Sequence, residues 1–281
     1  LDGVTGVQTC ALPILLARIL AERRAKWEAE HPGKRYVEPA APVTDGLPEL
    51  PAGWCWASWK QIGFSQNGRS FPSQQYQAFG VRLLRPGNLD VHGKVIWTEA
   101  NTRHMSEKWA RDFPHYLVGG SELVINLTAQ SLKDEFLGRV CMTDASERCL
   151  LNQRIARLSP VIVLPTYVFW LFKSPIFRRF VDSLNAGSLI QHMFTSQLDG
   201  FLLPLPPLPE QHRIVAEIER RLSVVAALEA TIAANLARAG RLRQAVLKCA
   251  FEGRLVAQDM SDTTAATTAR EDGAPWTVGA T

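Results

Sequence analysis

The sequence is short of the features that mark several large classes of protein. It contains no run of about 18 apolar residues, so we expect no membrane span. Its five cysteines are scattered and none lies in a Cys-x-x-Cys pair. This argues against a zinc site or a disulfide framework and favours free thiols in the cytoplasm. The net charge of +4 is small, so charge alone favours an anionic partner only weakly.

Motifs for catalysis are absent as well. The sequence has no glycine-rich phosphate loop, no His-Glu-x-x-His, no Gly-x-Ser-x-Gly and no amino-methyltransferase motif. The six histidines are singly placed, without the spacing of metal ligands. Asp134 and Glu135 beside Lys133 would suit a metal-dependent nuclease, but a charged loop explains them better because no third acid is spaced with them. We therefore expect a protein that is not an enzyme and holds neither a metal nor a cofactor.

The strongest positive signal is a long apolar periodicity in residues 209–253. Pro206 and Pro207 impose an extended approach, and Pro209 suits the first turn of a helix. Apolar residues then recur at steps of three or four, which predicts one long helix with a single apolar stripe. Such a helix needs a helical partner, although an amphipathic helix on a globular core is the alternative. The predicted coiled-coil seam consists of Ile214, Ile218, Leu222, Val225, Ile232, Leu236, Ala239 and Val246.

The preceding part of the sequence predicts one globular domain at residues 53–208. Short apolar runs between Gly, Pro, Asp or Asn residues predict strands at 81–84, 94–97, 123–127, 139–142 and 154–158. Residues 167–184 predict a helix, and the absence of βαβ repeats favours an α+β fold. The flanking segments are 1–14 (probable sequencing-adapter artefact), 15–30 (short amphipathic helix), 31–52 (Pro-rich linker) and 257–281 (disordered tail).

Three irregular loops of this domain carry amide, hydroxyl and basic side chains. Amides suit adenine edges and arginine suits guanine edges, while hydroxyl and lysine groups also hold phosphates. Each residue could equally be an ordinary solvated loop residue. The candidate DNA-binding residues are Gln66, Asn67, Arg69, Ser70, Gln74 and Gln75 in the first loop, Gln130 and Lys133 in the second, and Ser188, Gln191, His192 and Thr195 in the third.

The segment Pro204–Val215 carries a resemblance to a known family. It reads Pro-Leu-Pro-Pro-Leu-x-Glu-Gln-x-Arg-Ile-Val and resembles the specificity subunits of type I restriction–modification enzymes. The likeness continues at Arg241–Lys248 and Ala250–Leu255 and covers roughly residues 15–256. Subunits of this family contain two target recognition domains, each followed by a long helix, and the two helices pair antiparallel as a spacer. This sequence resembles the second half, with one target recognition domain and one complete spacer helix.

The resemblance implies a subunit that reads one half of a bipartite target in double-stranded DNA. Its partners would be methyltransferase (modification) subunits and, through the complex, a restriction/translocase subunit; catalysis would belong to them. Because the end of the preceding spacer helix and the start of the next would emerge from the same domain, we expect residues 15–27 to pack antiparallel against approximately Ile214–Val225. The alternatives are a coiled-coil protein-interaction scaffold, a small metal-dependent nuclease, and a half-size subunit that self-associates through its helix.

Overall fold

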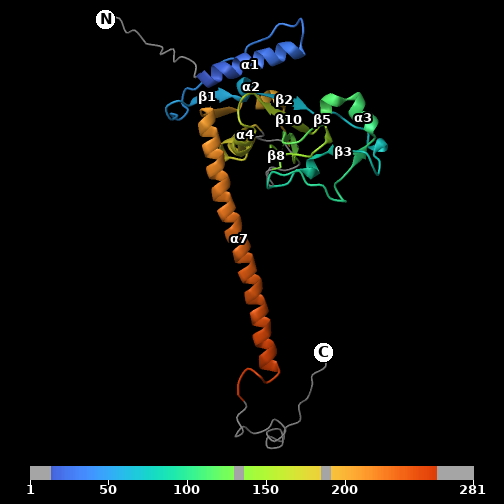
Figure 1. The fold of residues 1–281 in the computed structure, drawn as a ribbon, viewed down its shortest axis with the longest axis vertical. Helices are drawn as coiled ribbons and strands as arrows, with labels where there is room; N and C mark the ends of the chain where they lie inside the picture. The colour runs from blue at the N-terminus through green and yellow to red at the C-terminus, as the bar shows by residue number, and fades with distance from the viewer. Residues whose placement is uncertain (1–13, 130–135, 185–190, 258–281) are drawn as a thin grey trace, which may run out of the picture. The chain divides into compact units, whose positions relative to one another are not determined.

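The computed structural model describes residues 14–129, 136–184 and 191–257 (Figure 1). Its contacts divide the chain into two units, of which the first ends at Ile218 and the second begins at Glu219. The first unit contains all the strands of the described part and most of its helices. The second contains most of the long helix α7, Leu208–Phe251.

The first unit is built on a central antiparallel sheet with the strand order β2-β10-β6-β8. A second sheet has the order β4-β3-β9-β5, and its β3–β9 pair is parallel. The strands of the central sheet are β2 Gly63–Asn67, β6 Leu123–Asn126, β8 Val140–Met142 and β10 Ile155–Pro160. Those of the second sheet are β3 Val81–Leu84, β4 His104–Met105, β5 Leu117–Val118 and β9 Cys149–Leu151.

Two short strand pairs complete the sheet structure. The chain enters the domain along β1, Cys55–Ser58, and leaves it along β12, Leu202–Leu205, which pair antiparallel with Cys55 opposite Leu205. The pair of β7, Thr128–Ala129, and β11, Gln191–His192, joins segments that are distant in sequence. The shorter helices are α2 Trp59–Ile62, η1 Ser73–Gln75, η2 Pro86–Asn88, α3 Glu107–Asp112, η3 Pro114–Tyr116 and α6 Thr195–Leu198.

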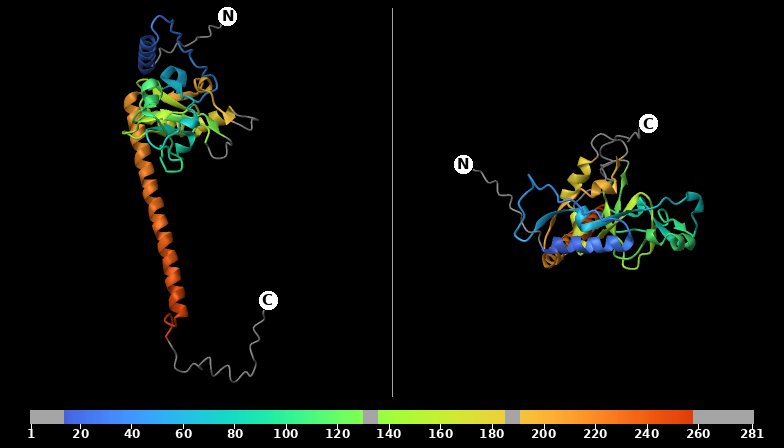
Figure 2. Two further views of the ribbon diagram at one scale, coloured as in Figure 1. Left: turned by 90° about the vertical axis from the view of Figure 1, so that its right-hand side faces the viewer. Right: turned by 90° about the horizontal axis from the view of Figure 1, so that it is seen from above.

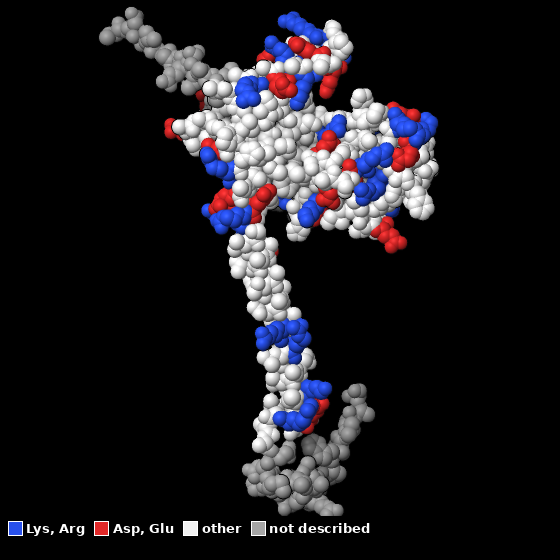
Figure 3. Space-filling model, in the orientation of Figure 1, with Lys and Arg blue, Asp and Glu red and all other residues white. Residues whose placement is uncertain are grey.

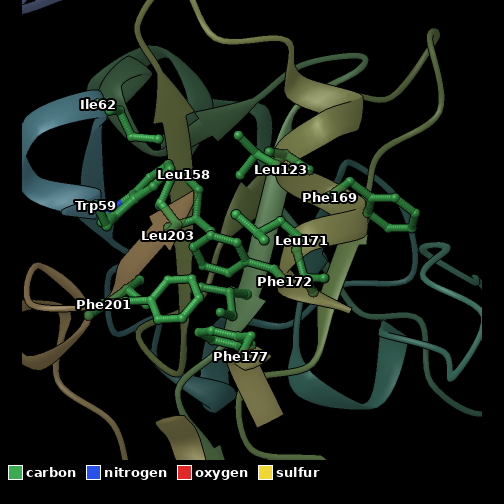
Figure 4. Packing of buried hydrophobic residues seen from close by; sticks show 14 of the residues in the cluster. Trp59, Ile62, Leu123, Leu158, Phe169, Leu171, Phe172, Phe177, Phe201 and Leu203 are labelled. Carbon is green, nitrogen blue, oxygen red and sulfur yellow. The ribbon is translucent and has the colours of Figure 1, made fainter. Parts of the chain in front are cut away.

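The central sheet is buried on both faces. Because side chains alternate along a strand, Leu123 and Ile125 of β6 enter the main core while Val124 enters a smaller core together with Leu84 and Leu151 of the second sheet. Aromatic rings from several elements fill the main core (Figure 4). The ring of Phe172 lies 5.3 Å from that of Trp59 and 5.4 Å from that of Phe201, in edge-on contacts. This packing holds the central sheet, from which the loops extend, in one position.

Two local sequence expectations were wrong. The helix predicted at 167–184 is two helices, α4 Pro165–Phe172 and α5 Pro175–Ser183, because Pro175 cannot continue α4 and instead begins a new helix. The segment predicted as a strand at 94–97 forms only isolated bridges, Leu89–Val95 and Lys94–Met142. Of the other predicted strands, 81–84 coincides with β3, and the bounds of the remaining three lie within two residues of the observed ones.

Helix α1, Ile14–Glu30, lies along the outside of the first unit in both views of Figure 2. It packs against α2, and its Leu16 and Ile19 enter the main core. Arg23 is also buried; its Nη1 donates to the Gly63 carbonyl at 2.5 Å, and desolvation lowers its pKa. The expectation that 15–27 pack antiparallel against α7 is wrong for the turns of α7 in this unit, where α1 and Leu208–Ile218 do not form a helix pair.

Helix α7 has 44 residues, so it is about 66 Å long at 1.5 Å per residue. The predicted long helix is therefore present. Ile214 packs against the main core, whereas Leu222, Val225, Ile232, Leu236 and Val246 are exposed, with Ile232 at 58% and Leu236 at 69%. Ala239 is exposed too. An apolar stripe of this length in contact with water needs a partner.

By length and composition alone α7 could also cross a membrane, since an 18-residue window has a mean hydropathy of 1.3. One or two such helices are weak evidence for a span. Glu229 is the only charged residue between Arg221 and Arg238, and a charged side chain at the centre of a membrane helix costs about 2.5–3.5 kcal/mol. The carboxylate and the seven-residue repeat of the stripe favour a helical partner over lipid.

Candidate nucleic-acid interface

The candidate interface lies at one end of the central sheet. Strand β2 ends at Asn67 and β6 ends at Asn126, while β8 begins at Val140 and β10 begins at Ile155. The antiparallel registers bring these four residues to the same side, since Asn67 is opposite Ala156, Ile155 opposite Asn126 and Ile125 opposite Val140. We call this end of the sheet, defined by Asn67, Asn126, Val140 and Ile155, the loop edge.

Backbone hydrogen bonds fix the first loop to the loop edge. The Gly68 N–H donates to the Ile155 carbonyl at 2.9 Å, and the Arg69 N–H donates to the Leu151 carbonyl at 2.9 Å. The Gln153 N–H in turn donates to the Arg69 carbonyl at 2.8 Å. At Gly68 a Cβ atom would lie 2.1 Å from the Asn152 carbonyl oxygen, so only glycine permits this close approach. The start of the first loop is therefore held in one position.

The second and third loops meet at the same edge. Thr128 pairs with His192 and Ala129 with Gln191, which makes a short two-stranded ribbon from segments on different loops. The Leu127 N–H donates to the Arg154 carbonyl at 2.9 Å, and the Met193 N–H donates to the Leu127 carbonyl at 3.0 Å. This ladder ties the ribbon to the central sheet, so parts of all three predicted loops lie along the loop edge.

Some of the predicted residues present free polar groups there. Asn67 was predicted in the first loop, but it is the last residue of strand β2. It is exposed, as are Ser70 in the first loop, Gln74 in η1 and His192 in β11. Thr195 is half-buried at the start of α6. The predicted residues Gln130, Lys133 and Ser188, and the side chain of Gln191, lie outside the described part of the structure.

Other predicted residues are engaged in internal contacts. The Gln66 Nε2 donates to the His115 carbonyl at 2.6 Å, and its Oε1 accepts from the Arg157 guanidinium. The Gln75 Oε1 accepts from the Trp109 indole N–H at 3.1 Å. The Arg69 guanidinium lies 3.8 Å from the centre of the Phe113 ring, a cation–π contact. Both ends of the Gln66 amide therefore take part in internal hydrogen bonds.

Sequence reasoning missed three exposed residues at or beside the loop edge. Gln153 and Arg154 lie in the turn that leads into β10, between the first and second loops. Phe194, 65% exposed, follows the β11 strand and offers an apolar surface of the kind that contacts a thymine methyl group. The signal for Gln153 and Arg154 was their position at the start of the strand predicted at 154–158, but the sequence does not show that this strand end adjoins the other loops.

The charges of the first unit are largely interspersed. Figure 3 shows Lys and Arg side chains close to Asp and Glu side chains over much of the visible surface. Arg82 pairs with the buried Glu147 at 2.7 Å, and Arg148 pairs with Glu107 at 2.9 Å. The Arg154 side chain has no ion pair within the described residues, so its charge at the loop edge is available for an anionic ligand.

The described residues contain no cluster of metal ligands. Within residues 14–129, 136–184 and 191–257, no group of three His, Cys, Asp or Glu side chains could hold a metal ion. Asp134 and Glu135, which the nuclease alternative invoked, lie outside these ranges. Burial raises the pKa of the Cys141 thiol to about 12, which makes it a poor nucleophile.

Curated proteins similar to this chain are specificity subunits. The chain is 30% identical over 210 residues to the type I restriction enzyme EcoAI specificity subunit of Escherichia coli, a match that covers 73% of this chain and 34% of that protein. It is 26% identical over 219 residues to the EcoKI specificity subunit of Escherichia coli (strain K12), covering 74% of this chain and 44% of that protein. The chain thus spans less than half the length of these relatives. No family model matches it.

The fold is also similar to a known one. A chain of a solved type I R-M system matches with a TM-score of 0.57 at 22% sequence identity, over 86% of this chain and 57% of that chain. At this identity the likeness concerns the fold alone. It confirms the predicted α+β class with a long C-terminal helix.

Proposed function

This chain belongs to the specificity-subunit family of type I restriction–modification systems, and we propose that it reads one half of a bipartite target in double-stranded DNA. The single observation that carries the proposal is the convergence of its three polar loops on the loop edge. A reader of base sequence needs side chains of different chemistry within one groove, and a rigid sheet that holds them there.

The loop edge supplies the two kinds of contact that sequence recognition requires. Asn67, Ser70, Gln74 and His192 carry exposed donors and acceptors for base edges, and Arg154 supplies positive charge for a phosphate. Phosphate contacts set the position of a protein on the duplex, and base contacts discriminate between sequences. The β7–β11 ribbon is a further candidate, because the major groove admits a two-stranded ribbon.

The exposed stripe of α7 supports a second part of the proposal. We expect its seam to pair with a second helix, either in a partner chain or in another copy of this one, and the assembled rod to set the distance between two half-sites. Methyltransferase subunits would dock on that rod and, with a restriction/translocase subunit, would carry out the chemistry. The chain itself would act in the cytoplasm without a cofactor.

The proposal is tested by expressing the chain with the matching modification subunits and sequencing the methylated sites in the host DNA. Asn67→Ala and Ser70→Ala should each relax the base preference at one target position. Ser146→Ala is the matched control, because Ser146 is an exposed hydroxyl in the turn after β8, at the opposite end of the sheet. If Asn67→Ala and Ser70→Ala methylate the same sites as the wild-type chain and the control, then Asn67 and Ser70 do not read bases. Assembly with the partners but no DNA binding would favour the scaffold alternative.

A further inference from the structure

A small hollow lies beside the loop edge, between the start of β8 and the turn that joins α4 to α5. Its volume is about 250 Å³, and its polar lining comes from Arg139, Lys173, Ser174 and Arg178. Sites for drug-sized ligands are usually about 300–1,000 Å³, so this hollow suits a smaller group. Arg139 is opposite Asn126, whose N–H donates to the Arg139 carbonyl at 3.0 Å, and this places the hollow at the base of the second loop.

Three cationic side chains line the hollow, and their partners differ. Arg178 is held by Asp182, with a 2.8 Å ion pair, and by the Leu137 carbonyl at 3.0 Å. The Arg139 Nη1 donates to the Leu89 carbonyl at 3.1 Å. The Lys173 Nζ donates only to the Val91 carbonyl, at 3.2 Å, and has no ion pair within the described residues. Partial burial lowers the pKa of Lys173, although the nearby Asp90 carboxylate opposes this shift.

The N-terminus of the nine-residue helix α5 lines the same hollow. Ser174 is its N-cap residue, but the hydroxyl makes no capping hydrogen bond, and its Oγ is buried with no partner in the described part of the chain. Pro175 has no N–H, so the N–H groups of Ile176 and Phe177 are the first donors of the helix, and no side chain caps them. The unpaired Ser174 hydroxyl, the uncapped amides and the ammonium group are all hydrogen-bond donors. Together they are suited to bind an oxyanion.

We infer that this hollow binds a phosphodiester group of the DNA backbone next to the target half-site. The inference rests on the proposed function, because the loop edge places DNA beside the hollow. Lys173 would neutralise the phosphate, while the Ser174 hydroxyl and the α5 N–H groups would donate hydrogen bonds to its oxygens in a fixed geometry. Such a contact would carry no sequence information but would set the register of the loops on the duplex. The hollow is thus a positioning site that sequence variation in the loops would leave intact.

The test uses the full chain and a random-sequence DNA duplex, with affinity measured by fluorescence anisotropy over a range of salt concentrations. Lys173→Gln should make the log–log salt slope shallower by about one, as the loss of a single phosphate contact does. Ser174→Ala should weaken binding at low salt without changing the charge of the protein. Lys34→Gln is the control, since it removes the same charge from an exposed position in the linker; it should keep the wild-type slope.

A second measurement follows the amide NMR signals of Ile176 and Phe177 during titration with the duplex and, separately, with inorganic phosphate. Both signals should shift with the duplex. Shifts with inorganic phosphate but not with DNA would assign the hollow to a free anion and overturn the inference. A wild-type slope for Lys173→Gln together with wild-type affinity for Ser174→Ala, with DNA still bound, would also overturn it while leaving the proposed function intact. Failure of the wild-type chain to bind DNA at any salt concentration would instead overturn the proposed function itself.

Discussion

The Gln211 side chain joins three segments at the start of α7, and its replacement by leucine should destabilise the first unit. Gln211 is fully buried. Its Oε1 accepts from the Leu164 N–H at 3.0 Å, and its Nε2 donates to the Pro206 carbonyl at 2.9 Å. Leucine has a similar size but leaves both backbone groups without partners.

The expected magnitude follows from those two groups. Each buried polar group left without a partner costs about 1–3 kcal/mol, so Gln211→Leu should lower the free energy of unfolding by about 2–6 kcal/mol. For a domain of this size each kcal/mol lowers the Tm by about 2–4 °C, which gives a fall of at least about 4 °C. Near-UV circular dichroism measures this melting, because all the tryptophans in the described part of the chain belong to the first unit.

The matched control is Gln244→Leu, since Gln244 is an exposed amide on α7. It should leave the near-UV melting temperature unchanged. If Gln211→Leu melts within about 1 °C of the wild-type chain, then the hydrogen bonds of Gln211 do not hold the first turn of α7 on the domain, and the reasoning is wrong.

Three further predictions concern other elements. Gly68→Ala should lower both the Tm and the DNA affinity, because its Cβ would lie 2.1 Å from the Asn152 carbonyl oxygen. The control Gly87→Ala should change neither, since no atom would lie within 4 Å of its Cβ, and equal melting curves for the two variants would contradict this. The pKa of Cys141 is raised to about 12, so mass spectrometry should find this thiol unalkylated at pH 8 until the chain unfolds. The free energy of unfolding should fall as the pH rises above about 9, because there only the thiol of the unfolded chain ionises. If α7 pairs with a second helix as proposed, Leu236→Glu should abolish that pairing in sedimentation experiments, with the near-UV melting of the first unit unaltered.

Features set by local sequence were predictable. The apolar repeat through Ile218, Val225 and Ile232 fixes a helix by itself, since residues one heptad apart share a face. The first loop was predicted from its polar composition, although Gln66 and Asn67 at its start belong to strand β2. The split between α4 and α5 was signalled by Pro175, but the aromatic run on either side outweighed that signal in the interpretation.

Features set by distant contacts were not predictable. Gln66 and Arg69 have the composition of DNA-reading residues, yet His115, Arg157 and Phe113 engage them from elsewhere in the chain. Gln211 belongs to the motif that carries the family resemblance, but only the fold shows that it is buried between Leu164 and Pro206. The hollow at Lys173 depends on three elements that meet only in the folded domain.

The pairing of β1 with β12 has a consequence for how the domain is joined to the segments on either side of it. Because Cys55 lies opposite Leu205, the polypeptide enters and leaves the domain through adjacent positions. The residues between those two strands therefore form one segment whose two ends are adjacent. If the chain reads DNA as proposed, exchange of this segment for one with different loops should alter which bases are read, while the neighbouring helical segments keep the same point of attachment.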